Sequence, residues 1–275
     1  MSIGDSRSCT RRQVQRPRSW HFRDEGAGRP LILLHGIGMS LRAWGAVTPY
    51  LRANRRVISF DIAGFGRTPP LPHGTPPTVG NLVDALADAL SELGFSSPID
   101  FAGNSLGGIM ALEAARRGIA RSAVAISPAG LWERQPPAHV TCIFGAMRAM
   151  STHVPGALKA ALGVAWFREM VLALPLSVGS RRMSATDACQ AVDDLRQSTA
   201  FESTFESTRL AFCGRGIAVP TTVVFGERDW IFPAWSRRRN AVPTHVRWLT
   251  KPGWGHVPLW VDPAGVANLI LDATR

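Results

Sequence analysis

The chain has 275 residues, and its 45% apolar content is enough to bury one large core, which excludes disorder as its main state. Its net charge of +11 comes almost entirely from arginine, a balance that suits nucleic-acid or anionic-membrane partners. Because no run of about eighteen apolar residues occurs, and the arginine clusters in residues 1–23 and 237–239 are not interleaved with aromatic side chains, we expect no stable membrane insertion and no nucleic-acid binding.

The first residues predict no export signal. Arg11-Arg12 is followed by QVQRPRSWHFRDEG instead of an apolar core, so a cytoplasmic location is expected. The cysteines are scattered, without a C-x-x-C pair or a nearby histidine at zinc-ligand spacing. We therefore expect no metal site and structural or incidental thiols at Cys9, Cys142, Cys189 and Cys213.

The first half of the chain alternates between strand and helix patterns. Short apolar runs bounded by glycine predict buried strands in LILLHG (31–36), RVISFDI (56–62) and PIDFAG (98–103). Between the last two, apolar residues recur at helical spacing from Val79 to Leu90. Strands that alternate with helices predict an α/β fold with a mainly parallel sheet covered on both faces.

The same alternation returns near the end of the chain. SAVAISPA (122–129), TTVVFG (221–226) and HVRWL (245–249) predict further strands, and PAGVANLILDA (263–273) predicts a final helix that starts on proline. Between the first two of these strands, residues 131–214 break the pattern. We therefore expect a core of residues 1–130 and 215–275 with a helical insertion at 131–214.

The insertion predicts two helices, 154–174 and 186–212, separated by the Gly/Ser/Arg-rich segment VGSRR. Its FESTFEST repeat places Phe201 and Phe205 one turn apart on one face, where packing is the expected role. A two-copy repeat does not predict a solenoid.

The stretch GNSLGG (103–108) follows a predicted buried strand and opens a predicted helix. A G-x-S-x-G pattern in that context is typical of a nucleophile elbow, in which small neighbours at Gly103 and Gly107 leave room for a sharp turn. The alternative is that the glycines only let the strand turn into the helix. A serine hydroxyl needs a base to become a useful nucleophile, so Ser105 requires a histidine partner.

His256 is the predicted base, because GWGHVP is a glycine-rich loop between the last predicted strand and the last helix. His35 and His245 are expected to be structural, and His139 and His153 fall in the insertion. The imidazole needs an orienting carboxylate, and Asp229 in FGERDW follows a predicted strand where such a group belongs. Glu227 is the alternative acid, expected to be a solvated turn charge.

A tetrahedral intermediate also needs amide donors for its oxyanion. We expect one from Leu106, directly after the nucleophile, and one from Ile37 in the small-residue turn HGIG. Asn104, Gly36 and Val257 adjoin these groups and are the predicted substrate contacts.

From Leu31 to Arg275 the chain resembles the α/β-hydrolase superfamily. The matching motifs are LLHGIG for the oxyanion loop, DIAGFGRT for the turn after the next strand, GNSLGG for the elbow, GERD for the acid and GWGH for the base. The order Ser105, Asp229, His256 is that of the family. The resemblance implies a sheet of the eight-stranded type, with residues 131–214 as a helical cap over the active site.

Subfamily resemblances are partial. Asn104 is similar to the pattern in carbon–carbon bond hydrolases of vinylogous diketones, but those have tryptophan after the catalytic histidine, where this chain has Val257. Haloalkane dehalogenases and epoxide hydrolases of this fold use an aspartate nucleophile, which Ser105 does not match. Proline-iminopeptidase-like members carry tryptophan after the serine, where this chain has Leu106.

Three functions are therefore open. The main expectation is a lidded serine hydrolase, without metal or organic cofactor, that cleaves a small or medium, largely apolar ester, lactone or thioester. The apolar composition of the insertion favours an apolar acyl pocket. The alternatives are a carbon–carbon bond hydrolase using the same three residues and a ligand-binding protein that has lost turnover. A small-molecule partner is expected in each case, and the sequence does not indicate the oligomeric state.

Overall fold

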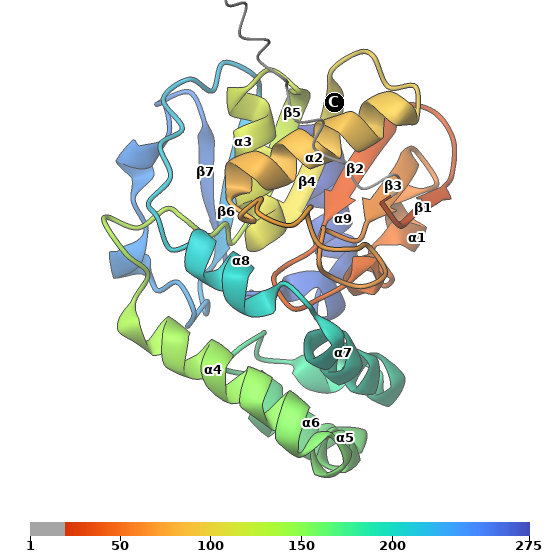
Figure 1. Ribbon diagram of the computed structural model, residues 1–275, viewed down its shortest axis with the longest axis vertical. Helices are drawn as coiled ribbons and strands as arrows, with labels where there is room; N and C mark the ends of the chain where they lie inside the picture. The colour runs from red at the N-terminus through yellow and green to blue at the C-terminus, as the bar shows by residue number, and fades with distance from the viewer. Residues whose placement is uncertain (1–19) are drawn as a thin grey trace, which may run out of the picture.

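A computed structural model describes residues 20–275, so Cys9 and Arg11-Arg12 lie outside the described residues. A seven-stranded sheet forms the centre of this part of the chain (Figure 1). Its spatial order is β1-β3-β2-β4-β5-β6-β7, with β1 antiparallel to β3 and the other neighbouring pairs parallel. The strands are β1 (Phe22–Glu25), β2 (Pro30–Leu34), β3 (Arg56–Phe60), β4 (Ile99–Asn104), β5 (Ala120–Ile126), β6 (Thr221–Gly226) and β7 (Arg247–Lys251).

The α/β class and the mainly parallel sheet are confirmed, but the strand count differs from the eight-stranded type. Residues 20–275 contain seven strands, and β1 has no counterpart among the predicted elements. Its sequence FRDE lacks an apolar run because β1 is an edge strand with a single neighbour and partly exposed residues. Phe22 nevertheless packs against Phe60 of the adjacent strand.

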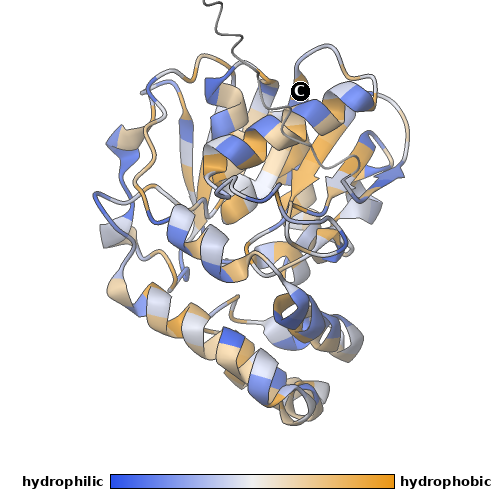
Figure 2. Ribbon diagram, viewed as in Figure 1, coloured by the Kyte–Doolittle hydropathy of each residue, from blue (hydrophilic) through white to orange (hydrophobic). Residues whose placement is uncertain are grey.

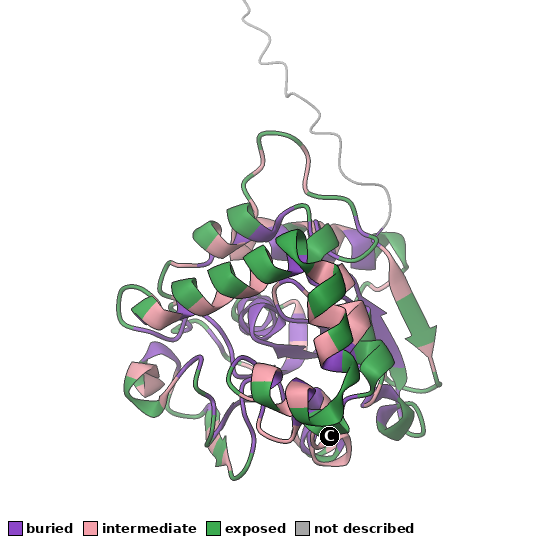
Figure 3. Ribbon diagram, turned by 90° about the horizontal axis from the view of Figure 1, so that it is seen from below, coloured by how far each residue is buried: buried purple, intermediate pink, exposed green. Residues whose placement is uncertain are grey.

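Helices cover both faces of the sheet, and strands and inner helix faces carry most of the apolar and buried residues (Figures 2 and 3). On one face lie α2 (Val79–Glu92) and α3 (Leu106–Arg116), whose Leu86 and Met110 share a core cluster with Phe101 of β4. On the other lie α1 (Thr48–Leu51) and α9 (Pro263–Ala273), whose Leu51 and Ile270 share a second cluster with β2. The short 3-10 turns are η1 (Leu41–Trp44), η2 (Ser180–Arg182), η3 (Ala234–Ser236), η4 (Arg239–Ala241) and η5 (Pro258–Trp260).

Five helices between β5 and β6 lie beside the carboxyl ends of the strands, in the lower part of Figure 1. The predicted helix over 154–174 breaks at Val164, whose backbone is extended, and the one over 186–212 breaks at Ser198 for the same reason. The 16-residue α4 was not predicted as a separate helix. The five are α4 (Ala138–His153), α5 (Pro155–Gly163), α6 (Ala165–Leu172), α7 (Ala185–Gln197) and α8 (Phe201–Ser207).

The strand order creates a crevice at the carboxyl edge of the sheet. β2 lies between β3 and β4, so the chain leaves β2 toward one side and returns on the other. Loops that follow β2 and β4 therefore separate, and ligands of open α/β sheets bind at such a switch point. The segments 35–40 and 104–106, which hold Ile37 and Ser105, adjoin this point.

The arginines at 237–239 are engaged in local structure. Arg237 stacks its guanidinium 4.5 Å from the Phe225 ring and donates to the carbonyls of Gly226 and Phe232. Arg239 donates to four carbonyls in residues 242–246. Within residues 20–275, no helix combines the length and apolar character needed to cross a bilayer.

Candidate active site

Ser105 lies on a strained turn between β4 and α3. Its φ of 53° and ψ of −109° fall where non-glycine residues are rare, and its side chain is largely buried. A Cβ on Gly103 would come 2.1 Å from the Gly107 carbonyl oxygen, and one on Gly107 would come 2.1 Å from the Leu34 carbonyl oxygen. Both positions therefore require glycine for the turn to close.

The structure brings Ser105, His256 and Asp229 together from three separate loops. The Ser105 Oγ lies 3.1 Å from Nε2 of His256, within the range of a nucleophile and its base. Nδ1 of His256 lies 3.2 Å from each carboxylate oxygen of Asp229. All three side chains are buried, so the His256 imidazole exposes almost no surface to bulk water, and neither do the Ser105 and Asp229 side chains that it contacts.

Asp229 is held as a carboxylate by its surroundings. Burial alone raises the pKa of this group, but attraction to His256 and hydrogen bonds from His256 and the Phe232 amide outweigh it, and the pKa falls below its usual 3.8. The Ile231 and Phe232 N–H groups donate to Oδ1 at 3.1 and 2.9 Å. Glu227, the alternative acid, is exposed and accepts from the Gly253 N–H at 3.3 Å.

The loop after β2 is fastened to the start of α3. The Gly107 N–H donates to the His35 carbonyl at 2.9 Å, while no acceptor within residues 20–275 binds the Ile37 or Leu106 N–H. His35 accepts from the Ile62 N–H at Nε2, so its Nδ1 carries the proton and donates to the Gly36 carbonyl at 2.7 Å. Burial lowers the pKa of His35, which keeps this structural imidazole neutral.

The three predicted substrate contacts, Asn104, Gly36 and Val257, all line one cavity. Asn104 uses both amide hydrogens, donating to the Ile126 carbonyl at 3.1 Å and to the His256 carbonyl at 2.9 Å. This leaves its Oδ1 buried without a partner among the described residues.

The loop that carries His256 is bound to the segment after α6. The Gly255 N–H donates to the Ser177 hydroxyl at 2.9 Å, and the Val257 N–H donates to the Leu176 carbonyl at 2.9 Å. The His256 and Phe232 rings also pack in a T-shaped arrangement, with centroids 4.8 Å apart. These supporting residues were not identified from sequence, because their only signal is proximity in the folded chain.

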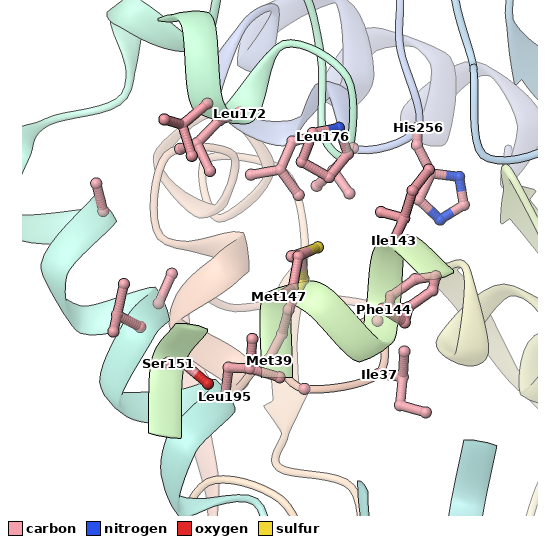
Figure 4. Close-up of a pocket in the computed structure, with 18 of the residues that line it drawn as sticks. Ile37, Met39, Ile143, Phe144, Met147, Ser151, Leu172, Leu176, Leu195 and His256 are labelled. Atoms are coloured by element: carbon pink, nitrogen blue, oxygen red, sulfur yellow. The ribbon is translucent and has the colours of Figure 1, made fainter. Parts of the chain in front are cut away.

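The cavity has a volume of about 250 Å³ and an almost wholly apolar lining. Figure 4 shows His256 toward one end, with side chains from the loop after β2 and from α4, α6 and α7 around the space. Ser151, the other labelled polar residue, donates its hydroxyl to the Arg148 carbonyl at 2.8 Å. The labelled apolar residues are Ile37, Met39, Ile143, Phe144, Met147, Leu172, Leu176 and Leu195.

The other sequence candidates lie outside this arrangement. His139 places Nε2 2.9 Å from the Trp230 carbonyl and packs against Trp235, while His153 ends α4. Phe201 and Phe205 stack with centroids 6.3 Å apart. Across residues 20–275, His, Cys, Asp and Glu side chains form no group of three placed to hold a metal ion.

Comparison with known proteins places these features in a family. The alpha/beta hydrolase family matches residues 31–269. An epoxide hydrolase of Mycobacterium tuberculosis is 32% identical over 202 residues, covering 69% of this chain and 91% of that protein. A 2-hydroxy-6-oxo-2,4-heptadienoate hydrolase of Pseudomonas putida is 41% identical over 100 residues, covering 35% of this chain and 36% of the relative.

Solved structures agree on the fold. A thermophilic esterase from Thermogutta terrifontis matches with a TM-score of 0.70 and 21% identity, covering 93% of this chain and 94% of that one. A meta-cleavage product hydrolase from Pseudomonas fluorescens matches with a TM-score of 0.71 and 20% identity, covering 92% and 93%. With the family match extending over residues 31–269, the chain belongs to the alpha/beta hydrolase family.

Proposed function

We propose that this hydrolase cleaves a small or medium, largely apolar carboxylic ester, lactone or thioester through an acyl-enzyme on Ser105. The observation that carries the proposal is the buried chain of contacts from Ser105 Oγ to His256 Nε2 at 3.1 Å and from His256 Nδ1 to Asp229 at 3.2 Å. This arrangement supplies a nucleophile, a base and an orienting charge in the order that acyl transfer requires.

In the first half-reaction, Ser105 Oγ attacks the carbonyl carbon as its proton passes to His256 Nε2. The carbonyl oxygen becomes an oxyanion and accepts from the Ile37 and Leu106 N–H groups, which have no acceptor within residues 20–275. His256 then protonates the leaving oxygen. Water repeats the sequence on the acyl-enzyme, releasing the acid and restoring Ser105, with no step that requires a metal or an organic cofactor.

Residues 131–214 are proposed as the cap of this site. Helices α4, α6 and α7 contribute much of the wall of the 250 Å³ cavity, and that wall is almost wholly apolar. A cavity of this character favours hydrocarbon groups, because its polar lining residues among residues 20–275 are few: Asn104, Ser105, Ser151, His256 and Trp260. A small-molecule substrate in a cytoplasmic setting, without nucleic acid, remains the proposed context.

Carbon–carbon bond hydrolysis is the second candidate. Asn104 precedes Ser105 and lines the cavity, and its buried Oδ1 has no partner in residues 20–275. The relative named for a heptadienoate substrate matches over 100 residues. However, no lysine or arginine among residues 20–275 lines this cavity, so these residues offer a carboxylate there no counter-charge. Apolar esters therefore fit the cavity better.

Epoxide hydrolysis, named for the 32% identical relative, fits less well. By the family resemblance, that chemistry uses an aspartate nucleophile, whereas Ser105 stands at the elbow of this chain. The third alternative is a protein that binds ligand without turnover, and the assembled Ser105–His256–Asp229 contacts disfavour it.

The proposal is tested by intact mass spectrometry after incubation with a fluorophosphonate. We expect one covalent adduct on the native protein and none on Ser105→Ala. Turnover of a panel of esters and vinylogous diketones then separates the first two candidates. An absence of adduct on folded native protein would refute an activated serine and favour the binding-protein alternative.

A further inference from the structure

Ser105 faces two cavities of very different size. The large cavity, about 250 Å³, contains Gly36, Asn104, His256 and Val257 in its wall. A second cavity of about 30 Å³ also reaches Ser105, from the side of Leu106 and Phe232. The small cavity therefore has about an eighth of the volume of the large one. Because the two cavities differ so much in volume, a large group of an ester that fits the large cavity would meet steric clashes in the small one.

The walls of the small cavity are tightly connected. Trp132 packs on Phe232 with ring centroids 5.4 Å apart, and its Nε1 donates to the Arg209 carbonyl at 2.9 Å. Phe144 and Phe205 pack 5.7 Å apart on another side. Because these rings are held by one another, the cavity can enlarge only by displacing packed side chains.

The position of His256 decides which half of the ester enters which cavity. His256 delivers its proton to the leaving oxygen, so the leaving group must lie on the side of the imidazole. His256 lines the large cavity but not the small one, from which Phe232 separates it. The leaving alcohol therefore belongs in the large cavity and the acyl group in the small one.

We propose that the preferred substrates join a short acyl group, of acetyl size, to a large apolar alcohol. The inference rests on the serine hydrolase function proposed above, and it reverses the expectation that the cap helices enclose the acyl chain. Ser105 Oγ bonds to the acetyl carbon, the bond to the alcohol oxygen breaks, and His256 passes the serine proton to that oxygen. Water then releases the short acid from Ser105.

Two isomeric esters test the assignment. Hexyl acetate and methyl heptanoate have the same atoms, but the short and long groups are exchanged across the ester. We expect kcat/KM to be at least about tenfold higher for hexyl acetate, because each poorly fitting methylene lowers kcat/KM by roughly 10–200-fold. Equal turnover, or preference for methyl heptanoate, would overturn the proposal.

Labelling with the fluorophosphonate distinguishes failure of the short-acyl proposal from failure of the serine hydrolase proposal. A labelled Ser105 with no turnover of either ester would refute the short-acyl class while leaving the serine hydrolase intact. No label and no turnover would refute the serine hydrolase itself. Mass spectrometry of enzyme quenched during hexyl acetate turnover should show an acetyl group on Ser105.

Variants in the two cavities provide matched controls. Val140→Ala enlarges the small cavity, so the ratio of kcat/KM for hexyl butanoate over hexyl acetate should rise about tenfold. Leu162→Ala shortens a side chain in the wall of the large cavity and enlarges that cavity instead, so it should leave the ratio unchanged. Phe205→Leu provides a second enlargement of the small cavity if Val140→Ala does not fold. A ratio that moves only with Leu162→Ala would contradict the assignment.

Discussion

At the residue scale, the site depends on buried charges that are each matched by a partner. Asp229 lies behind His256 and accepts two backbone N–H groups, so it stays ionised despite its burial. A buried carboxylate without such partners would take up a proton. Loop 229–232 therefore holds a negative charge beside His256, where it would stabilise an imidazolium.

Replacing that charge should separate catalysis from folding. Asp229→Asn keeps the size of the side chain but removes the partner charge of His256, and ester turnover should fall about ten-thousand-fold. Steady-state kinetics on a good ester measure the loss, and circular dichroism checks the fold. Glu227→Gln is the control, because its side chain is exposed and contacts the Gly253 amide. Unchanged turnover in Asp229→Asn would remove Asp229 from the mechanism.

Glu113 gives a prediction about pH and stability. Burial raises the pKa of this carboxyl, but hydrogen bonds from Arg116 and Arg117 outweigh burial and hold the pKa below its usual 4.5. A group with a lowered folded pKa stabilises above its unfolded pKa, and that stabilisation is lost as pH falls through the folded value.

Glu113→Gln should therefore reduce the free energy of unfolding by about 1–3 kcal/mol near neutral pH. The difference from the native protein should shrink as pH falls below 4.5. Urea unfolding at a series of pH values measures it, with the exposed Glu92→Gln as the control. A difference that grows toward acid pH would contradict this assignment.

The sequence motifs indicated the three proposed catalytic residues more readily than the side chains that surround them. Ser105, Asp229 and His256 could be selected because each follows or precedes a recognisable strand, and the structure brings them into contact. Phe232 and Ser177, which support His256, occupy segments with no motif. Such partners are determined by tertiary packing, which a local pattern does not encode.

At the element scale, the junction of β4 and α3 depends on backbone contacts that leave no space for side chains. Gly107 donates its N–H to the His35 carbonyl and lies against the carbonyl of Leu34. The start of α3 and the end of β2 are thereby held at a fixed separation. That separation sets the distance between the Ile37 and Leu106 amides.

Two glycine substitutions test this requirement. Gly107→Ala would place a Cβ 2.1 Å from the Leu34 carbonyl oxygen, and we expect a loss of at least about 2 kcal/mol in unfolding free energy together with loss of turnover. Gly145→Ala, in α4, meets nothing within 4 Å and should be neutral or stabilise by about 0.5–1 kcal/mol. Thermal unfolding compares them, and equal effects would show that the close approach is unimportant.

Element prediction succeeded where hydrophobic periodicity was strong. The final helix lies at its predicted bounds, Pro263–Ala273, and the strand at Thr221–Gly226 does likewise. Periodicity did not reveal the breaks at Val164 and Ser198, because the apolar pattern continues across each break while the backbone becomes extended. It also missed β1, whose polar sequence fits the edge of the sheet.

At the scale of the whole molecule, a buried charge cluster connects distant parts of the core. Asp100 at the start of β4 is fully buried and pairs with Arg29, Arg55 and Arg121, while Ser122 donates to it at 2.6 Å. The same arginines bind the Thr274 carbonyl. The cluster thus joins β4, β5 and the end of the chain, on the side of the sheet away from Ser105.

Neutralising Asp100 should weaken the whole fold. Asp100→Asn leaves the buried Arg55 without its counter-charge, which costs about 3–5 kcal/mol in such pairs. We expect a fall in Tm of roughly 6 °C or more. Asp272→Asn breaks an exposed pair with Arg247 and should change stability by less than about 1 kcal/mol. Differential scanning calorimetry distinguishes them, and a native-like Tm for Asp100→Asn would refute the role of the cluster.

The global arrangement was predictable in outline because alternating strands and helices leave few topologies. The presence of two cavities of unequal volume beside Ser105 could not be predicted from the sequence. The cavity walls combine Met39 with Met147 and Leu172, which lie more than a hundred residues further along the chain, and apolar composition alone gave no sign of two unequal cavities. Their boundary depends on how rings such as Phe144 and Phe232 pack.

The hydrogen bonds from Gly255 and Val257 to Ser177 and Leu176 carry a consequence for protein engineering. Both acceptors lie within residues 131–214, the proposed cap, yet they hold the loop that carries His256, the proposed base. A graft of residues 131–214 from another hydrolase would change the cavity wall, replace the Ser177 hydroxyl and alter the position of the segment that provides the Leu176 carbonyl. Chimaeras should therefore retain Leu176 and Ser177 of this chain. Otherwise the transplanted cap would leave the His256 loop without these two hydrogen bonds.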